Sequence, residues 1–378
     1  MALARPGSCA IRDPILRIFG LGDRSNERGV LQHLGDLHSS MAQYYGVQGR
    51  VLPGSEFAQN RRWFQPVATN VGYSSNCDEN PILVIPLLEP QPIIVMSNCV
   101  HNQLESLGQR YLKPTPYPNS AKLNLGLLHR IVDHLANEIS RVFDGNFNFH
   151  KYVSTKPGAA RRRFLKAYNQ MKNGDTDINL NSKIAAFVKN ERYFEEGKSP
   201  RMIMGRDPRL NILYCRFIAR LEDAFFKLEQ VANACDNKSC GQKFTRLYNR
   251  CKSMFENDMS KYEATQRKLL LCAEYLVYEK VLRQSGCSGE IDDLLTVFAA
   301  KCLKPVRTNE GVKAEFMWCR GSGDMDTSLG NGVINYITTM YFMCMNFCSS
   351  DCRLKHCSCG VFDAFVLKGD DSYGVSPR

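Results

Sequence analysis

The sequence has no long apolar run, and it does not open with the apolar segment of a secretory signal peptide. Its most apolar stretch, residues 81–96, is interrupted by Glu89 and by repeated prolines. This stretch is expected to form two short strands around a polar turn and not a membrane span. Without a signal peptide, the sixteen cysteines are expected to be reduced cytosolic thiols. Internal repeats and low-complexity tracts are also missing from the sequence.

Acidic residues are in shorter supply than basic ones. Asp and Glu total 38 against 49 Lys and Arg, which gives a net charge of +11. This excess favours a polyanionic partner, either nucleic acid or an anionic membrane surface; a soluble basic protein without such a partner is the alternative. At 378 residues, the chain is long enough for two or three subdomains and a well-buried core.

Residues 369–371, Gly-Asp-Asp, lie between two short strand-like segments, 361–367 and 372–375. Gly-Asp between strands predicts a tight hairpin turn that projects Asp370 and Asp371 from a rigid base. Adjacent carboxylates in this setting suit a divalent cation, although Asp and Gly are also ordinary turn residues.

A second acidic segment lies upstream. Asp258 follows a short apolar stretch, as expected at the end of a strand, and Glu263 precedes a helix expected over residues 264–282. Asp258 would join Asp370 on two Mg²⁺ ions roughly 3.5–4 Å apart, an arrangement that stabilises the attacking and leaving oxygens in phosphoryl transfer. Because Mg²⁺ also takes water and substrate phosphates as ligands, two or three Asp residues suffice. The alternative is that both acids are helix or strand caps.

Basic residues are concentrated in two segments. The first, residues 151–172, interleaves cations with Tyr152, Phe164 and Tyr168, which suits single-stranded nucleic acid; a solvated helix face with its rings in the core is the alternative. The second, residues 187–209, contains Gly and Pro and is expected to be an extended ribbon that lines a channel and leads into a helix over 217–225. The cations of the first segment are Lys151, Lys156, Arg161, Arg162, Arg163, Lys166 and Lys172.

A Gly-Ser-Gly loop at residues 321–323 precedes a helix expected to run to about Phe347. Thr327 and Asn331 lie four residues apart on one face of this helix. Gly330 and Gly332 are poor helix formers, costing about 1 kcal/mol each relative to Ala. Their presence predicts the close approach of another backbone or of a ligand.

Two further patterns concern helices. Apolar residues recur every four positions between Leu123 and Val142, which predicts an amphipathic helix; residues 31–45 could also be helical. Near the C-terminal hairpin, a continuing helix would place four thiol or imidazole groups on one face, within reach of a zinc ion. Ordinary reduced thiols are the favoured interpretation, because the spacing matches no standard zinc module. The group consists of Cys344, Cys348, Cys352 and His356, followed by Cys357 and Cys359.

Taken in order, these segments resemble the RNA-dependent RNA polymerases of positive-strand RNA viruses. Residues 322–331, Ser-Gly-Asp-Met-Asp-Thr-Ser-Leu-Gly-Asn, look like motif B in a tombusvirus-like form. Residues 256–266 look like motif A, with alphavirus-like and hepevirus-like features. Residues 368–372 look like motif C, and the ribbon between Lys189 and Arg206 looks like motif F.

The resemblance implies an α+β right-hand fold with helical fingers and an antiparallel-sheet palm. Residues 1–150 would form an N-terminal region and fingers extension, residues 151–250 the fingers with a basic channel, and residues 251–378 the palm. The chain ends at Arg378, so motifs D and E and the thumb are expected to be absent from it.

The resemblance also assigns roles to residues. Asp258, Asp370 and Asp371 would bind Mg²⁺, or Mn²⁺ in its place, and zinc is not expected. The residues that would contact the ribose 2′-hydroxyl are Glu263, Ser322, Thr327 and Asn331. The cations that would bind the triphosphate are Lys189, Lys198, Arg201 and Arg206. The cations that would bind RNA are Lys156, Arg161, Arg162 and Arg163.

Two departures from the family pattern affect the sugar site. Glu263 replaces a commoner Asp, so the contact is one methylene longer and sugar discrimination is expected to be looser. Asp326 stands where tombusvirus-like members often have Asn, which is expected to add a negative charge beside the ribose.

The activity expected from the resemblance is template-directed RNA synthesis on a viral genome. Its partners would be template RNA, nascent RNA and ribonucleoside triphosphates, in the host cytoplasm and in a replication complex on host membranes. A reverse transcriptase or DNA polymerase shares the two-metal palm but needs bulk to exclude the 2′-hydroxyl. A non-catalytic RNA-binding replication protein is the alternative from another class; it predicts strong salt dependence and no need for Mg²⁺.

Overall fold

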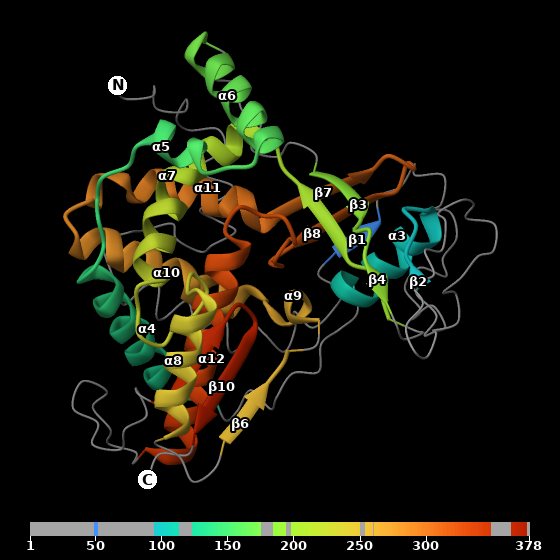
Figure 1. Ribbon diagram of the computed structural model, residues 1–378. Helices are drawn as coiled ribbons and strands as arrows, with labels where there is room; N and C mark the ends of the chain where they lie inside the picture. Colours follow the sequence, from blue (N-terminus) through green and yellow to red (C-terminus); the bar gives the residue numbers. More distant parts are fainter. Residues whose placement is uncertain are drawn as a thin grey trace.

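A computed structural model describes residues 49–51, 94–112, 123–174, 184–193, 198–249, 254–259, 261–348 and 364–375. The fold is α+β, as the sequence predicted, with a body of packed helices, a small antiparallel sheet and a larger mixed sheet (Figure 1). The helix considered for residues 31–45 and most of the segment 81–96 lie outside the described residues.

Five helices enclose the main apolar core. They are α4 (Leu125–Ser140), α7 (Pro208–Phe225), α10 (Lys268–Gln284), α11 (Ile291–Cys302) and α12 (Thr327–Phe347). The amphipathic pattern between Leu123 and Val142 correctly predicted α4, whose Leu127, Ile131 and Leu135 are buried against this core. A short 3₁₀ turn, η4 (Ser288–Glu290), leads into α11.

The small sheet carries the predicted hairpin. Its strand order is β6 (Met254–Asn257), β10 (Asp371–Val375) and β9 (Phe365–Lys368), and both pairs are antiparallel. Asp371 pairs with Lys368, so Gly369 and Asp370 form a two-residue turn, and Gly369 takes a φ of 69° that the turn requires. The sheet packs on α12 and on α8 (Asn237–Tyr248) (Figure 1).

The larger sheet has five strands, in an order that brings distant segments together. The predicted ribbon is extended here, since β3 and β5 form an antiparallel pair. A second core lies between this sheet and α3 (Val100–Leu107), which continues into the π-helix η2 (Gly108–Leu112). The order is β1 (Gly49–Val51), β8 (Lys313–Met317), β7 (Leu303–Thr308), β3 (Ile184–Val188) and β5 (Met202–Gly205); separately, β2 (Ile94–Val95) pairs with β4 (Arg192–Tyr193).

The basic segment 151–172 forms two helices, α5 (Phe149–Ser154) and α6 (Gly158–Lys172), and α6 projects from the top of the helical body in Figure 1. Its rings pack within the protein: Tyr168 stacks on Phe149 with ring centroids 4.3 Å apart, and Phe164 meets Tyr152 edge to face. The aromatic residues therefore serve a small core, as the alternative interpretation held.

Two predicted helices have different limits in the structure. The helix expected over 264–282 is broken into α9 (Tyr262–Thr265) and α10, because Gln266 and Arg267 leave the helical conformation between them and the Gln266 side chain is buried. Helix α12 ends at Phe347 and Cys348 is extended, so the helix considered for a zinc site does not continue through Cys348. In the described part of the chain, no helix is long and apolar enough to cross a membrane.

Candidate functional site

The acidic residues of the two predicted segments meet at one end of the small sheet. Asn257, the last residue of β6, pairs with Ser372 of β10, so Asp258 follows at the edge where Asp371 begins that strand. Asp370 lies in the adjoining turn. The fold thus brings Asp258, Asp370 and Asp371 together from segments that are distant in the sequence.

Repulsion among these carboxylates is visible at Asp371. Partial burial and the negative charges of Asp370, Asp258 and Glu256 raise the pKa of Asp371 above its ordinary value. Glu256, on β6, lies two residues before Asp258, a spacing that puts both on the same side of the strand's end. The sequence analysis gave Glu256 no role, although this alternation would have suggested one.

Two asparagines hold the hairpin turn in place. Asn335 of α12 donates from Nδ2 to the carbonyl oxygens of Gly369 (3.2 Å) and Asp371 (3.0 Å). On the other side, the backbone N–H of Gly369 donates to Oδ1 of Asn233 at 3.0 Å. Thr339 donates to Oδ1 of Asn335 at 3.1 Å, which leaves the Asn335 amide nitrogen for the turn. None of these three residues stood out in the sequence, because their partners lie far along the chain.

Glu263 is bound by an arginine from the N-terminal half. Nη1 of Arg110, in η2, lies 2.6 Å from Oε1 of Glu263. The same guanidinium donates to the carbonyl oxygens of Ser199 and Pro200, both at 2.9 Å. Arg110 therefore fastens the ribbon between Lys198 and Arg201 to the helix that carries Glu263, a role that no sequence pattern predicted.

The predicted triphosphate cations fall into two groups. Lys189 forms an ion pair with Glu191, Arg201 lies 3.6 Å from the same carboxylate, and Lys198 is exposed on the ribbon. Arg206 differs, since only 5% of its side chain is exposed and it binds Asp324 at 2.9 Å together with backbone carbonyls of residues 300–303. The expected place of Arg206 on the triphosphate is therefore corrected: its charge is used inside the protein.

The Gly-Ser-Gly loop is held by its own polar groups. Asp324 is buried, pairs with Lys304 and accepts a hydrogen bond from the N–H of Gly321 at 3.0 Å. The hydroxyl of Thr327 donates to the carbonyl oxygens of Gly321 (3.1 Å) and Asp324 (2.7 Å). The carbonyl of Ser322 accepts from the N–H of Met204 at 2.7 Å. Thr327 thus shapes the loop, and its hydroxyl proton is not directed at a ribose.

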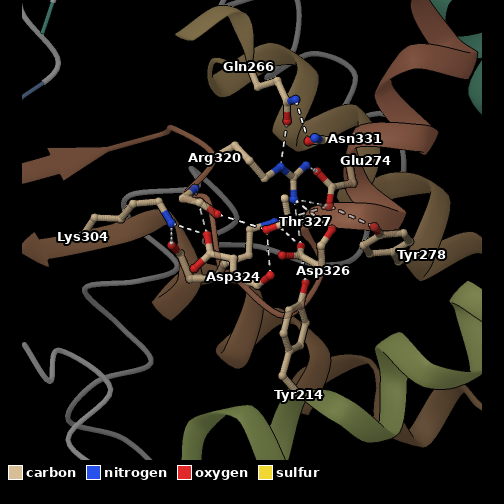
Figure 2. A network of polar contacts seen from close by, with 12 residues as sticks. Tyr214, Gln266, Glu274, Tyr278, Lys304, Arg320, Asp324, Asp326, Thr327 and Asn331 are labelled. Carbon is tan, nitrogen blue, oxygen red and sulfur yellow. Dashed lines mark hydrogen bonds and ion pairs between the residues drawn. The ribbon is translucent and has the colours of Figure 1, made fainter. Parts of the chain in front are cut away.

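Asp326 is fully buried at the centre of the network in Figure 2, so its charge is not available to a ribose, which corrects the expectation from sequence. Its Oδ2 pairs with Lys301, lies 3.1 Å from Nη1 of Arg320 and accepts from the hydroxyl of Tyr214 at 2.9 Å. Burial would raise the pKa of Asp326, but Lys301 and Arg320 outweigh it and hold the pKa well below its ordinary value. Glu274 pairs with Arg320 and Lys301 on the other side.

The glycines in α12 make room for side chains, not for a backbone or ligand as predicted. A Cβ on Gly330 would lie 2.3 Å from Nη1 of Arg320. A Cβ on Gly332 would lie 2.7 Å from the ring of Phe225. The close approach was inferred correctly, but its partners were not.

Asn331 is connected to this network through Gln266 (Figure 2). Nε2 of Gln266 donates to Oδ1 of Asn331 at 2.8 Å, while Oε1 of Gln266 accepts from Nε of Arg320 at 2.7 Å. The hydroxyl of Tyr262 donates to the backbone carbonyl of Asn331 at 3.2 Å. Burial raises the pKa of Tyr262, and the charge of Asp370 adds to this effect, so the acidic turn lies close enough to Tyr262 to act on it.

The predicted RNA-binding cations lie on α6 and just before it. Arg161, Arg162 and Arg163 are exposed, and the ammonium group of Lys156 sits 4.2 Å from the ring centroid of Tyr152. The cations are available to phosphates, whereas the rings beneath them are occupied by packing.

Among the described residues, no three His, Cys, Asp or Glu side chains converge closely enough to hold a metal ion by themselves. The acids at the end of the small sheet supply oxygen donors, which Mg²⁺ prefers, and their mutual repulsion is what a cation would relieve. Cys352, His356, Cys357 and Cys359 lie outside the described residues.

Comparison with known proteins identifies distant relatives. The chain is 26% identical to the RNA-directed RNA polymerase of groundnut rosette virus (strain MC1) over 178 residues, which cover 43% of this chain and 20% of that protein. It is 26% identical to the enzyme of oat chlorotic stunt virus over 202 residues, covering 49% and 26%. For tobacco necrosis virus (strain D), the values are 24% over 261 residues, covering 65% and 34%.

These matches make the chain a distant homologue of the RNA-directed RNA polymerases of tombus-like plant viruses. The aligned regions span about a fifth to a third of the length of these relatives. No family model matches the chain.

Proposed function

We propose that this chain carries the catalytic region of an RNA-directed RNA polymerase that copies a viral RNA by template-directed nucleotidyl transfer. The observation that carries the proposal is the meeting of Asp258 with the Gly369–Asp371 turn at one end of the small sheet. The proposal is supported by the relatives, each of which is named an RNA-directed RNA polymerase.

Asp258, Asp370 and Asp371 would hold two Mg²⁺ ions, or Mn²⁺ in their place. When bound, such ions stabilise negative charge on the attacking and leaving oxygens. The protein's part is to keep the acids together despite their repulsion, and Asn335 and Asn233 do this by fixing the turn on both sides. Bound water and the substrate phosphates would complete the ligand set.

The incoming ribonucleotide would lie between the ribbon and α12. Lys198, Arg201 and Lys189 would bind its triphosphate, and their exposure on the ribbon supports this role. Glu263 and Asn331 would contact the 2′-hydroxyl, which distinguishes ribose from deoxyribose. Ser322 belongs to the same loop, whose shape Thr327 maintains.

The template and product strands would bind through the exposed cations of α6 together with Lys156. These contacts are electrostatic and independent of sequence. In the right-hand interpretation, residues 1–150 and 151–250 supply the fingers and residues 251–378 the palm. Because the larger sheet joins strands from all three regions, they are proposed as functional regions and not as separate folding units.

The setting proposed for this activity is the host cytoplasm, in a replication complex associated with membranes. This part of the proposal rests on the relatives, and no helix in the described ranges is long and apolar enough to span a membrane.

The test uses the full-length protein that carries this chain. Asp370→Ala should abolish nucleotide addition on a primed RNA template while RNA affinity stays near that of the wild type. Asp223→Ala, which removes an exposed ion pair with Lys227, is the control and should remain active. Continued synthesis by Asp370→Ala would refute the assignment.

The same assay separates the alternatives. A non-catalytic RNA-binding protein would bind RNA with steep salt dependence, would not require Mg²⁺ and would add no nucleotide. A reverse transcriptase would prefer deoxyribonucleotides, whereas Glu263 and Asn331 offer hydrogen-bonding partners to a 2′-hydroxyl and favour ribonucleotides.

A further inference from the structure

The side chain of Gln266 is completely buried between a charged group and the sugar-site residue Asn331. We propose that Gln266 is a positioning residue that fixes Asn331 as a hydrogen-bond donor toward the nucleotide sugar. The inference rests on the proposed function, in which Asn331 faces the ribose 2′ position. It adds a direction to that contact and identifies the residues that set it.

Arg320 sets the orientation of the Gln266 side-chain amide. Its guanidinium is 1% exposed and is held by Glu274 and by Asp326. Arginine carries five N–H donors and has no acceptor. The atom of Gln266 that lies 2.7 Å from Nε of Arg320 must therefore be the oxygen, Oε1.

The orientation of the Gln266 amide then determines the orientation of the Asn331 amide. With Oε1 turned to Arg320, the amide nitrogen of Gln266 faces Asn331 and donates to its Oδ1 at 2.8 Å. The amide nitrogen of Asn331 consequently points away from Gln266, and within the described residues it donates no hydrogen bond. The Asn331 side chain is partly exposed, and its backbone is held by Tyr262, so Nδ2 is available to a ligand. Figure 2 shows Arg320, Gln266 and Asn331 in this sequence.

The same arrangement occurs one turn further along α12. Thr339 donates to Oδ1 of Asn335, and Nδ2 of Asn335 is thereby directed at the two carbonyl oxygens of the acidic turn. Asn331 and Asn335 thus each have an oxygen occupied from within the protein and a nitrogen directed at a functional element.

A fixed donor at Asn331 complements the carboxylate of Glu263. A hydroxyl can donate one hydrogen bond and accept others. The ribose 2′-hydroxyl would donate to Glu263 and accept from Asn331 at the same time. A 2′-deoxy sugar can do neither, so the pair selects ribonucleotides through two hydrogen bonds of defined direction.

Gln266→Glu reverses the direction with little change in shape. A carboxylate accepts from Arg320 and also from Asn331, so the Asn331 amide turns over and presents its oxygen to the sugar. The 2′-hydroxyl then faces two acceptors and satisfies only one. The buried network has four cations (Arg206, Lys301, Lys304, Arg320) against three carboxylates (Glu274, Asp324, Asp326), so it can accommodate the added negative charge.

The experiment measures kcat/KM of the full-length protein for a ribonucleoside triphosphate and for its 2′-deoxy analogue. We expect Gln266→Glu to lower the ribo/deoxy ratio about tenfold, the effect of one hydrogen bond, with little change for the deoxynucleotide. Asn331→Asp, which presents only acceptors at a partly exposed position, should give the same loss and keeps the test available if Gln266→Glu fails to fold. In an Asn331→Ala background, Gln266→Glu should change the ratio no further.

The outcomes separate this inference from the proposed function. If Gln266→Glu or Asn331→Asp lowers kcat/KM equally for both sugars, Gln266 has only a structural role and the inference is overturned. If Gln266→Glu still lowers the ratio in the Asn331→Ala background, the effect does not pass through Asn331 and the inference is also overturned. A wild-type protein that adds no nucleotide at all contradicts the proposed function itself.

Discussion

Replacing Asp326 by asparagine tests the buried network beneath the Gly-Ser-Gly loop. The substitution removes one negative charge and hardly alters side-chain volume. Asp326 is fully buried, and its Oδ2 serves Lys301, Arg320 and Tyr214 together. The sequence alone predicted that Asp326 adds a negative charge beside the ribose, at a position where tombusvirus-like members often have Asn.

The magnitude follows from the charges that remain. In the wild type, four cations face three carboxylates, and Asp326→Asn leaves four against two. Breaking a buried ion pair by removing one partner costs about 3–5 kcal/mol. Since the asparagine oxygen still accepts one hydrogen bond, we expect a loss near the lower end, about 3 kcal/mol. At about 2 °C per kcal/mol, the melting temperature should fall by about 6 °C.

The pH dependence gives this expectation a distinct signature. Lys301 and Arg320 hold the pKa of Asp326 below its ordinary value in the folded state, whereas in the unfolded chain it is about 3.9. A lowered pKa stabilises the folded protein above the unfolded-state value, and this stabilisation is lost as the pH falls further. The difference between wild type and Asp326→Asn should therefore be complete at neutral pH and should shrink below about pH 4.

Thermal melts followed by circular dichroism at pH 7 and at a series of acidic pH values measure both effects. The matched control is Asp223→Asn, which breaks an exposed ion pair with Lys227 and should cost less than about 1 kcal/mol. The reasoning fails if Asp326→Asn shifts the melting temperature no more than Asp223→Asn does. It also fails if the difference persists unchanged in acid.

Three further substitutions have defined outcomes. Gly330→Ala should destabilise the protein strongly in a thermal melt, because the added Cβ would lie 2.3 Å from Arg320. The control Gly241→Ala, in α8, meets nothing within 4 Å and should stabilise the protein by about 0.5–1 kcal/mol. Equal effects of the two substitutions would contradict this packing. Arg110→Met removes the three hydrogen bonds that fasten the ribbon and should raise KM for nucleotides more than it lowers kcat; an unchanged KM would deny it that role. Asp371→Asn removes a charge that is repelled by its neighbours, as the raised pKa of Asp371 indicates. Without metal, the variant protein should therefore melt no lower than the wild type, and it should bind Mn²⁺ less tightly. A clear loss of stability would contradict the repulsion.

Local patterns in the sequence predicted much of the fold. The four-residue repeat of α4, the extended ribbon of β3 and β5, and the hairpin of β9 and β10 depend on short-range periodicity and turn chemistry, which a single segment contains. The carboxylate strand β6 was also located correctly, because an acid after a short apolar run signals the end of a strand.

The remaining features depend on partners that are distant in the sequence. Arg206 and Asp326 looked like channel and sugar-site charges, but tertiary packing buries both against ions from α11 and the loop before α12. Arg110 and Asn335 belonged to no motif, and Gln266 had no assigned role within motif A, since each acquires its role only when it contacts a segment more than 30 residues away. Buried polar networks of this kind cannot be deduced from periodicity, which reports only which faces are apolar.

The central claim is that Asp258 and Asp370 act as one catalytic unit. Single-nucleotide addition on a primed RNA template, measured for Asp258→Asn, Asp370→Asn and the double variant of the full-length protein, tests it most directly. We expect each single substitution to lower the rate at least about 100-fold and the double variant to be no slower than the slower single one, because residues that act together lose their effect together. Near-normal addition by either single variant, or losses that multiply in the double variant, would contradict the account.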